Sequence, residues 1–412
     1  MEKIFDYEVL FIGGVYEEGK EQEYILKSKH GIQNAVNTHQ WNFIHGIDYN
    51  NLSPVQVLSA RYVEAYPNYK ELYVKRNAWS HAQNVNDENI GFLNVLIIKN
   101  IIRSLKLGIK AKKWAAKESN KQKLLVCYYP SLPQMNATIS AKKKNNQIKT
   151  VLIVPDIPMF MNLQKETKNF RQTIQRHINN RANKMIQYFD SYVILTEKMA
   201  EALKIEKEKC IVIEGMINEN EKSANKEVNA IMGKRKIVYA GSLHEKYGMR
   251  NYIDAIKQVK DTDVEFYIFG SGEMEEEIKE LAKKDKRIVF MGYKDRKTVL
   301  EYQKRAYVLI NPRPIDEEYT LYSFPSKIME YMMSGRPVLT TKLASIPKEY
   351  HEYLYFIEDS SSKGIKEAIE KILKKDNNEL INKGKSAQEF ILSNKNNKIQ
   401  MKKLLEFISN IN

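Results

Sequence analysis

The C-terminal half of the chain alternates strictly between short apolar runs and segments whose apolar residues recur at helical spacing. We predict strands at Lys236–Ala240, Glu265–Phe269, Arg287–Met291, Ala306–Asn311 and Val338–Thr341. Each consecutive pair is separated by a predicted helix, the first of which begins near Asn251. Such alternation is typical of a parallel sheet with right-handed crossovers and helices on both faces.

The N-terminal half alternates more loosely but is of the same kind. Its predicted strands are Tyr7–Ile12, Val55–Ala60, Leu124–Tyr128, Val151–Val154, Ser191–Leu195 and Cys210–Ile213. Its predicted helices are Ile32–Ile44, Leu93–Lys117 and Lys165–Phe189. A polar stretch at Met216–Lys234 separates the halves. We therefore predict two doubly wound α/β, Rossmann-like domains, 1–217 and 234–392, with a C-terminal helix in 393–412 that crosses back to the first.

The charge and the cysteines narrow the classes of partner. A formal net charge of +15 favours an anionic partner, but the chain has no recognised nucleic-acid-binding motif. Cys127 and Cys210 lie at the ends of apolar runs, without a neighbour at metal-ligand spacing, and are expected as buried thiols in a reducing cytosol. No His, Asp and Glu set has metal spacing either, so no metal is expected.

Targeting signals are not expected. Asp6 and Glu8 interrupt the first apolar run, and no stretch reaches the roughly 20 apolar residues that span a bilayer. The expected location is the cytosol, with a peripheral membrane contact as an option. That option depends on Lys99–Lys123, which carries nine Lys or Arg, one Glu and a stripe of aliphatic residues. Two interpretations are open: a cationic helix on anionic lipid, or an amphipathic crossover helix with a solvated face.

The segment Tyr319–Val338 is the most specific local pattern. Pro325 is predicted near the first position of a helix that ends at Gly335, with Ser323 or Phe324 as its cap. A helix N-terminus that follows a polar loop favours a phosphate, because its free N–H groups and its dipole face the anion. Ser326 lies at that terminus, Lys327 adds positive charge, and the carboxylate of Glu330 is placed to bind ribose hydroxyls.

Loops after other predicted strands carry further candidates, because ligands bind at the carboxyl ends of parallel strands. In the C-terminal half these are the loop Gly241–Gly248, with Ser242 and Lys246, the turn Gly270-Ser271-Gly272, and Arg313, which is suited to bidentate phosphate contact. In the N-terminal half, Gly13 and Gly14 follow the first strand. Asp156 follows the strand Val151–Val154, where a simple Asx-turn is an equal alternative.

The segment Tyr319–Val338 resembles the donor-binding signature of family-4 glycosyltransferases of the GT-B fold. Two glutamates with seven residues between them mark that signature; Glu330 matches the second, whereas Tyr322 stands at the first. The Phe324–Lys327 sequence is similar to that of bacterial members that build capsules and exopolysaccharides. Lys246 matches the usual basic residue of the diphosphate loop, whereas Ser242 replaces the usual Arg. The resemblance spans nearly the whole chain but is motif-specific only after about Lys236.

The resemblance implies two Rossmann-like domains that face each other across a cleft, and a retaining transfer from a nucleoside diphosphate sugar, with a UDP-sugar favoured. The acceptor would be a lipid-linked glycan or another glycan. Lys and Arg would replace a metal ion at the diphosphate. Catalytic roles would fall to Lys246, Glu330 and Asp156, the last beside the reacting sugar. Gly13 and Gly14 would approach the donor phosphate, and Gly270–Gly272 would pass near the base.

Two other functions stay open at the level of sequence. The departures at Tyr322 and Ser242 favour a non-catalytic GT-B subunit that supports a partner transferase. The second alternative is a GT-B sugar-nucleotide epimerase, which would act on the donor without an acceptor.

Overall fold

The computed structural model describes residues 4–157, 180–219 and 234–411. The chain forms two compact units: unit 1 comprises Met1–Met216 and Asn397–Asn412, and unit 2 comprises Ile217–Asn396. The division lies at the start of the predicted boundary Met216–Lys234. The returning segment begins at Asn397, later than the predicted residue 393, because helix α12 (Asn377–Asn394) stays in unit 2.

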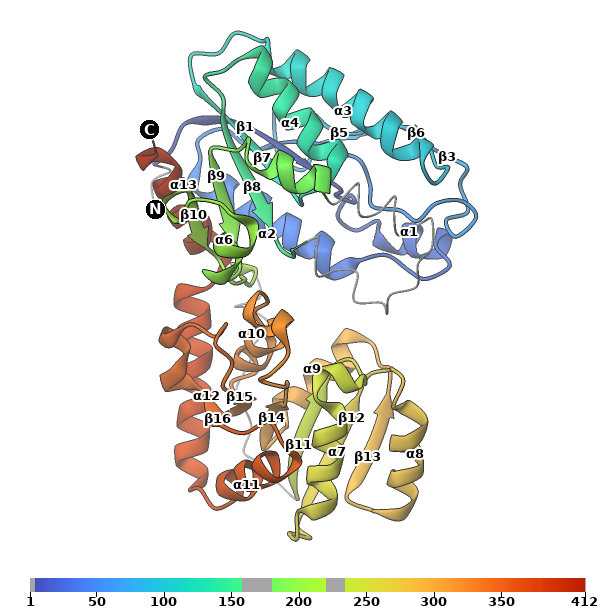
Figure 1. The fold of residues 1–412 in the computed structure, drawn as a ribbon, viewed down its shortest axis with the longest axis vertical. Coiled ribbons are helices and arrows are strands. Elements are labelled where there is room, and N and C mark those ends of the chain that lie inside the picture. The colour runs from blue at the N-terminus through green and yellow to red at the C-terminus, as the bar shows by residue number, and fades with distance from the viewer. Residues whose placement is uncertain (1–3, 158–179, 220–233, 412) are drawn as a thin grey trace. The chain divides into compact units, whose positions relative to one another are not determined.

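Unit 2 contains one six-stranded sheet with the order β13-β12-β11-β14-β15-β16, and its strand pairings are parallel (Figure 1). The strands are β11 (Arg235–Ala240), β12 (Val264–Phe269), β13 (Ile288–Gly292), β14 (Val308–Asn311), β15 (Val338–Thr341) and β16 (Tyr355–Ile357). The helices are α7 (Met249–Gln258), α8 (Glu275–Lys284), α9 (Arg296–Lys304), α10 (Ser326–Met333), α11 (Ser362–Leu373) and α12, with short 3-10 turns η3 (Glu245–Tyr247), η4 (Glu318–Leu321) and η5 (Lys348–Tyr353).

The alternation of side chains along β11 explains why this sheet is covered on both faces. Ile237 and Tyr239 belong to one apolar core, which α7 and α11 complete. Val238 and Ala240 point to the other face and join a second core, to which α10 and α12 contribute. Because successive strand residues point to opposite faces, an uninterrupted apolar strand requires helices on both sides.

Unit 1 contains an eight-stranded sheet with the order β10-β9-β8-β7-β1-β2-β5-β4. Its strands are β1 (Tyr7–Gly13), β2 (Gln56–Ser59), β4 (Asn77–Trp79), β5 (Asp87–Asn89), β7 (Gln122–Tyr128), β8 (Lys149–Val154), β9 (Ser191–Ile194) and β10 (Cys210–Val212); β3 (Tyr73–Val74) and β6 (Phe92–Leu93) form a separate antiparallel pair. The helices are α1 (Glu21–Lys27), α2 (Asn34–Asn50), α3 (Ile98–Ala115), α4 (Leu132–Lys144), α6 (Lys198–Leu203) and α13 (Asn397–Asn410), with the 3-10 turn η1 (Lys207–Lys209).

Helix α13 is part of the core of unit 1. Its buried residues Met401, Leu404, Leu405 and Ile408 join the core that α2 and the central strands form. The helix approaches α2 so closely that a Cβ atom at Gly46 would lie 2.4 Å from the carbonyl oxygen of Asn397. The chain therefore returns to unit 1, as predicted, and α13 is needed to complete the core of that unit.

Several predictions differ from the structure in detail. The edge strand β4 pairs antiparallel with β5, which the loose pattern of residues 73–93 did not indicate. The predicted helix Leu93–Lys117 begins only at Ile98, because Phe92 and Leu93 pair with β3. Cys127 is buried as expected, but Cys210 is partly exposed, so the prediction for its thiol was wrong. Most of the predicted helix Lys165–Phe189 lies outside the described residues.

Within the described ranges, the helices are too short or too polar to cross a bilayer.

Candidate active site

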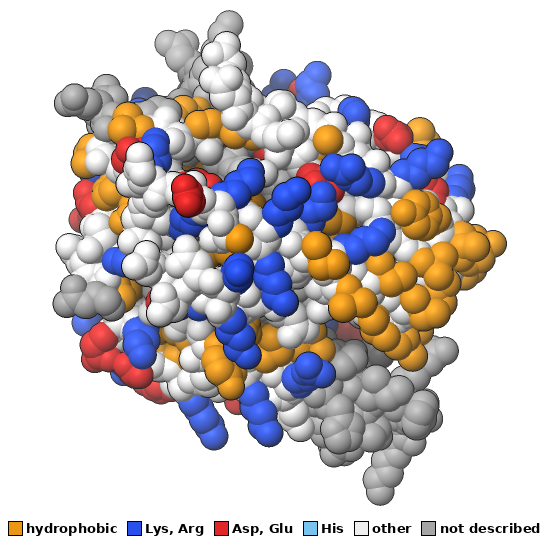
Figure 2. All heavy atoms as spheres, turned by 90° about the horizontal axis from the view of Figure 1, so that it is seen from above, with side chains coloured by type: hydrophobic (Ala, Val, Ile, Leu, Met, Phe, Trp, Pro, Cys, Tyr) orange, Lys and Arg blue, Asp and Glu red, His pale blue; other side chains and the backbone are white. Residues whose placement is uncertain are grey.

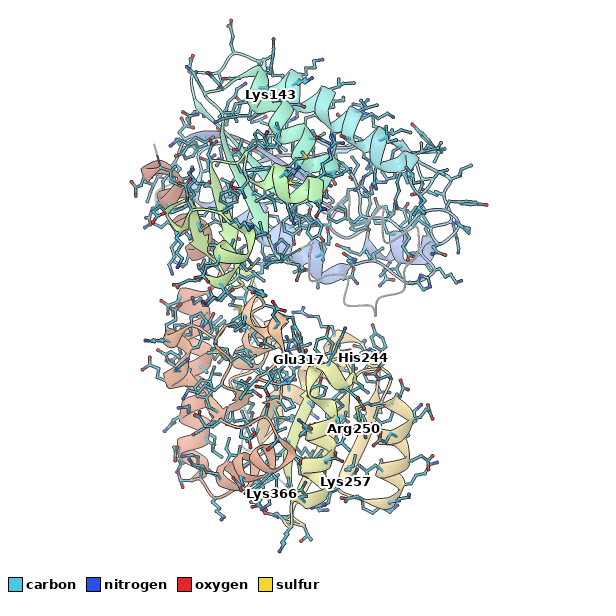
Figure 3. All side chains as sticks on the ribbon, viewed as in Figure 1. Lys143, His244, Arg250, Lys257, Glu317 and Lys366 are labelled. Carbon is cyan, nitrogen blue, oxygen red and sulfur yellow. The ribbon has the colours of Figure 1, made fainter. Side chains whose placement is uncertain are left out.

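The strand order of unit 2 reverses between β11 and β14, and the predicted donor-binding loops follow these two strands. In doubly wound sheets, the crevice for a ligand opens outside the carboxyl ends of the strands at this switch point. Figure 3 labels His244 and Glu317 at that end of unit 2, whereas Lys257 and Lys366 lie at the opposite end. The sheet topology therefore selects one end of unit 2 for the candidate site.

Three loops meet at this end through glycines. A Cβ atom on Gly248, whose φ is +86°, would lie 1.9 Å from the carbonyl oxygen of Pro312, in the loop after β14. A Cβ atom on Gly270, whose φ is +134°, would lie 1.8 Å from the carbonyl oxygen of Gly241. Only glycine adopts such a conformation at this spacing without a shift of the backbone. The glycines thus hold the loops after β11, β12 and β14 in direct contact.

Two predicted cations lie on one aromatic ring. The Nζ atom of Lys246 lies 5.0 Å from the centre of the Tyr247 ring, and the guanidinium carbon of Arg313 lies 5.3 Å from it. Tyr319 packs edge-on against the same ring and donates its hydroxyl proton to the carbonyl oxygen of Lys246 at 2.7 Å. The Tyr247 ring therefore binds one cation from the loop after β11 and one from the loop after β14, at the switch point.

The start of helix α10 differs from the prediction by one residue. Pro325 lies near the first helical position, as predicted, but it is itself the N-cap residue and the helix begins at Ser326. Ser323 and Phe324 are not caps: the Ser323 hydroxyl donates to the carbonyl oxygen of Tyr319, and Phe324 is buried against Tyr350. Pro325 lacks an N–H and a side-chain oxygen, so this N-cap residue forms no side-chain capping hydrogen bond with α10.

Glu330 of this helix accepts hydrogen bonds from two side chains. Lys327 donates to its Oε1 atom at 2.9 Å, and Gln303 of α9 donates to the same oxygen at 2.7 Å. Burial alone would raise the pKa of Glu330, but the charge of Lys327 and these hydrogen bonds outweigh burial and lower the pKa. Glu330 is therefore a carboxylate at neutral pH, and both donors occupy one of its two oxygens.

The remaining predicted donor-binding residues surround these loops. The carbonyl oxygen of Ser242 accepts a hydrogen bond from the Tyr239 hydroxyl at 2.8 Å, and that of Ser271 accepts one from the N–H of Leu243 at 3.0 Å. A Cβ atom on Gly272 would lie 2.6 Å from the backbone of Leu243, so this glycine is also needed for the loop contact. Tyr322 ends the turn η4, and Ser326 is exposed.

In unit 1, packing accounts for the glycines after β1. The N–H of Gly14 donates to Oε1 of Gln40 at 2.8 Å. A Cβ atom on Gly14 would lie 2.4 Å from the Tyr62 ring, and one on Gly13 would lie 2.3 Å from Oε1 of Gln40. Both glycines are thus required by the contacts of α2 and Tyr62, and their predicted approach to a phosphate stays a prediction.

Asp156 lies directly beyond β8, next to the loop after β7. Its side chain is exposed, but desolvation by the surrounding protein raises its pKa to about 6. The hydroxyl of the neighbouring Tyr128 forms a 2.9 Å hydrogen bond with Nδ1 of His39, and burial lowers the pKa of that histidine to about 4. The carboxyl ends of β7 and β8 therefore carry a carboxyl group that titrates close to neutrality.

Sequence reasoning missed four residues that shape the site. They are Tyr247, Tyr319, Tyr331, which bridges α10 to the backbone of Ala240, and Gln303. Gln303 did give a signal, because helical spacing places its amide on the same face as Val299, and a buried amide needs a partner. The tyrosines gave none, since the sequence does not show which loops meet.

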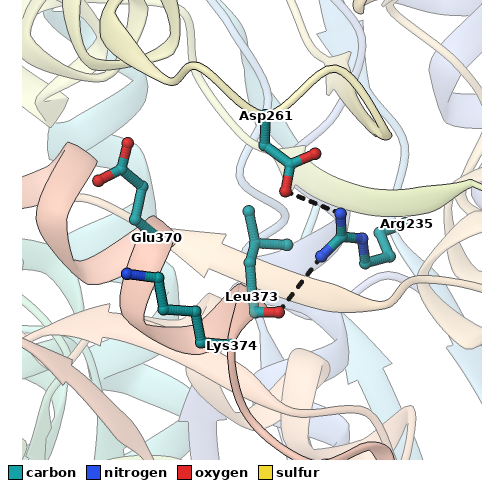
Figure 4. A pocket seen from close by; sticks show the side chains of 5 residues that line it. All are labelled: Arg235, Asp261, Glu370, Leu373 and Lys374. Atoms are coloured by element: carbon teal, nitrogen blue, oxygen red, sulfur yellow. Dashed lines mark hydrogen bonds and ion pairs between the residues drawn. The ribbon is translucent and has the colours of Figure 1, made fainter.

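Away from this end, unit 2 has a pocket of about 320 Å³ lined by Arg235, Asp261, Glu370, Leu373 and Lys374 (Figure 4). It lies beside the first residue of β11, at the amino end of the strand. Arg235 is already bound there to Asp261 and to the carbonyl oxygen of Leu373. In the described parts of both units, groups of three or more His, Cys, Asp or Glu suited to a metal ion are absent.

Comparisons with known proteins concern the fold and the C-terminal half of the chain. Residues 234–375 match the family model described as glycosyl transferases group 1. No curated protein sequence matches the chain. Among solved structures, sucrose-phosphate synthase from Thermosynechococcus elongatus is similar with a TM-score of 0.62 and 14% identity, over 97% of this chain and 98% of that one.

Two further structures extend the comparison. HepE of Anabaena, in complex with UDP, has a TM-score of 0.56 at 12% identity, over 98% of this chain and 99% of that one. The apo form of the lipopolysaccharide outer core galactosyltransferase WaaB has a TM-score of 0.57 at 13% identity, over 98% and 99%. At such identities these likenesses establish the fold, which is GT-B, and the family match covers most of unit 2. The protein is therefore a glycosyltransferase with a group 1 domain at residues 234–375.

Proposed function

We propose that the chain is a retaining family-4 transferase that moves a sugar from a nucleoside diphosphate sugar, UDP in the first instance, to a hydroxyl of a lipid-linked or other glycan. Synthesis of a capsule or another cell-surface polysaccharide would be its setting. The supporting observation is the arrangement at the switch point of unit 2, where Lys246 and Arg313 share one aromatic ring. UDP is the first choice because a structural neighbour, HepE, was solved with it.

The donor would bind through its charges. Lys246, Arg313, Lys327 and the uncapped N-terminus of α10 would attract the diphosphate. As the bond between the anomeric carbon and the phosphate oxygen breaks, negative charge grows on the nucleoside diphosphate, and the same groups stabilise it. The acceptor oxygen bonds to the anomeric carbon and its proton passes to the leaving phosphate. The cations would make a metal ion unnecessary, so we expect activity in the presence of a chelator.

Glu330 would hold the ribose. Its pKa is lowered, so it is ionised, and the two donors that it already binds share one oxygen. The other oxygen is then free to accept bonds from ribose hydroxyls. For unit 1 we propose that Asp156 orients the sugar or the acceptor, because its raised pKa makes it responsive near neutral pH.

The test is nucleotide binding by the purified chain. A thermal-shift screen over nucleoside diphosphates and their sugars should find one donor that stabilises by about 2.7 kcal/mol at 100 times its dissociation constant. Glu330→Gln should weaken that binding. Glu280→Gln is the control, because Glu280 also forms an i,i+3 ion pair with a lysine, Lys283, on another helix of unit 2, with the order of the two residues reversed and both more exposed. The absence of a shift with every nucleotide would defeat the proposal.

A second candidate function is a non-catalytic subunit that supports a partner transferase. Tyr322 and Ser242 favour it, because the resemblance places a glutamate and an arginine at these positions. Donor turnover by the chain alone separates the two functions. Turnover that Glu330→Ala abolishes supports the transferase, whereas nucleotide binding without turnover supports the subunit.

A further inference from the structure

Helix α3 of unit 1 carries an apolar edge that faces solvent. Ile101, Leu105 and Ile109 follow one another at intervals of four residues and are 56, 62 and 65% exposed. Leu96 and Ile97, just before the helix, are 59 and 62% exposed. This is the aliphatic stripe that the sequence indicated in Lys99–Lys123, and most of it does not pack into the core.

The core contacts of the same helix come from a different face. Leu107, Ala111 and Trp114 are buried and pack with the strands and with other helices. An amphipathic crossover helix needs only this one apolar face, and its other face is expected to be polar. The solvated-face interpretation of α3 therefore does not account for the exposed edge.

The apolar edge continues onto a neighbouring element. Leu72, directly before β3, and Tyr73 of the β3–β6 pair are 49 and 51% exposed. The Nζ atom of Lys106 on α3 lies 5.9 Å from the centre of the Tyr73 ring, which places the pair beside the helix. Figure 2 shows hydrophobic side chains gathered over one part of this face, with Lys and Arg side chains next to them. Contiguous apolar patches on a protein surface mark interaction sites.

The cations of the segment Lys99–Lys123 divide into two groups. Arg103 and Lys123 are buried, Lys99 and Lys106 donate to backbone carbonyl oxygens, and Lys110 pairs with Glu88. A cationic surface on this segment must therefore be formed by its other Lys residues. Exposed cations remain at the end of the helix and on the adjoining helix α4; they are Lys112, Lys113, Lys117, Lys143 and Lys144, of which Figure 3 labels Lys143.

We propose that unit 1 docks onto an anionic phospholipid surface through this edge of α3 and the tip of the β3–β6 pair. The aliphatic side chains enter the boundary between headgroups and acyl chains, and the lysines contact the lipid phosphates. Charge complementarity favours this occupant over a second copy of the chain. The segment Val95–Lys117 contains no Asp or Glu, so a second copy would bring the same cations and no acidic partner from this segment.

Vesicle flotation with the full chain tests the proposal. The protein should float with vesicles of phosphatidylcholine and phosphatidylglycerol and far less with phosphatidylcholine alone. Ile101→Gln, Leu105→Gln and Ile109→Gln should each lower the partition coefficient by roughly tenfold. Lys112→Gln, Lys113→Gln and Lys117→Gln should each lower it by roughly fivefold, and added salt should weaken binding in the same direction.

Leu52→Gln is the matched control for Leu105→Gln, because Leu52 is 56% exposed, lies in the loop before β2 and not on α3, and its substitution should leave binding unchanged. Nucleotide affinity, measured on the same variants, reports separately on the site in unit 2 and should not change. Equal flotation of Leu105→Gln and wild type would overturn the proposal. So would sedimentation that shows a dimer which Leu105→Gln dissociates, since the edge would then bind a second copy.

Discussion

Gly248→Ala is the substitution that most directly tests how the loops of unit 2 build the site. Gly248 has a φ of +86°, and a Cβ atom there would lie 1.9 Å from the carbonyl oxygen of Pro312. Alanine therefore introduces two costs: a left-handed backbone conformation and an overlap with the backbone of another loop. The overlap must push the loop after β11 away from the loop that carries Arg313.

The two costs can be separated within the same unit. Left-handed strain costs about 1–2 kcal/mol for a residue with a side chain, and overpacking typically adds about 1–3 kcal/mol. Gly292 has a φ of +65°, but a Cβ atom there would meet its nearest neighbour at an ordinary 3.7 Å. Gly292→Ala is thus expected to cost only the strain, and Gly248→Ala about 1–3 kcal/mol more. In a unit of this size, each kcal/mol lowers Tm by about 2–4 °C.

The assay combines urea unfolding with titration of the nucleotide that the thermal-shift screen identifies. Gly248→Ala should unfold at lower urea than Gly292→Ala and should bind the nucleotide more weakly, because Lys246 and Arg313 are separated. The reasoning is refuted if the two variants are equally stable and bind the nucleotide equally well.

Three further outcomes depend on titrating groups. The pKa of Glu330 is lowered in the folded protein, so its ionised form stabilises unit 2 above its ordinary pKa of 4.5. This contribution is lost as pH falls through the lower folded value. In urea unfolding, Glu330→Gln should therefore lose less stability below pH 4.5 than wild type does. In unit 1, burial alone would lower the pKa of His81, but Asp48 and Asp87, at 3.1 and 2.6 Å, outweigh it and raise the pKa to about 9. These two contacts should stabilise unit 1 by roughly 3 kcal/mol below pH 6.5, and by less as pH rises through 9. If the stability of His81→Gln has the same pH dependence as that of wild type, this expectation is wrong. If Asp156 acts as a carboxylate, donor turnover should fall as pH drops through about 6, and Asp156→Asn should be slow at every pH; a variant with the wild-type profile would exclude the role.

The sequence predicted the fold well where apolar runs are long and alternate with helical spacing. The central strands of both sheets, such as β1 and β11, lie within one or two residues of the predicted runs. It failed at the periphery, because β16 contains only Tyr355–Ile357 and the strands β4 and β5 are polar in part. Short edge strands are defined by the neighbours with which they pair, and local pattern does not reveal those.

The sequence predicted where the candidate residues lie relative to the strands, but not which residues they contact. The rule that ligands bind beyond the carboxyl ends of strands selected Lys246, Arg313 and Glu330. The partners Tyr247 and Gln303 come from loops and helices whose proximity only the fold defines. Helix α3 shows the same limit, because helical spacing identified its aliphatic stripe but not which stripe faces the core.

The return of α13 to unit 1 has a consequence for how the protein is made. Residues of α13 complete the core of unit 1, yet the ribosome must synthesise all of unit 2 before α13 exists. At about 5–20 residues per second, that interval lasts roughly 10–40 s. During this time the surface of α2 that receives Met401 and Leu405 is uncovered on the nascent chain. Unit 2 is complete only at Asn396, directly before α13, so the two units become complete almost together, and the N-terminal part of unit 1 is the part that stays incomplete for longest.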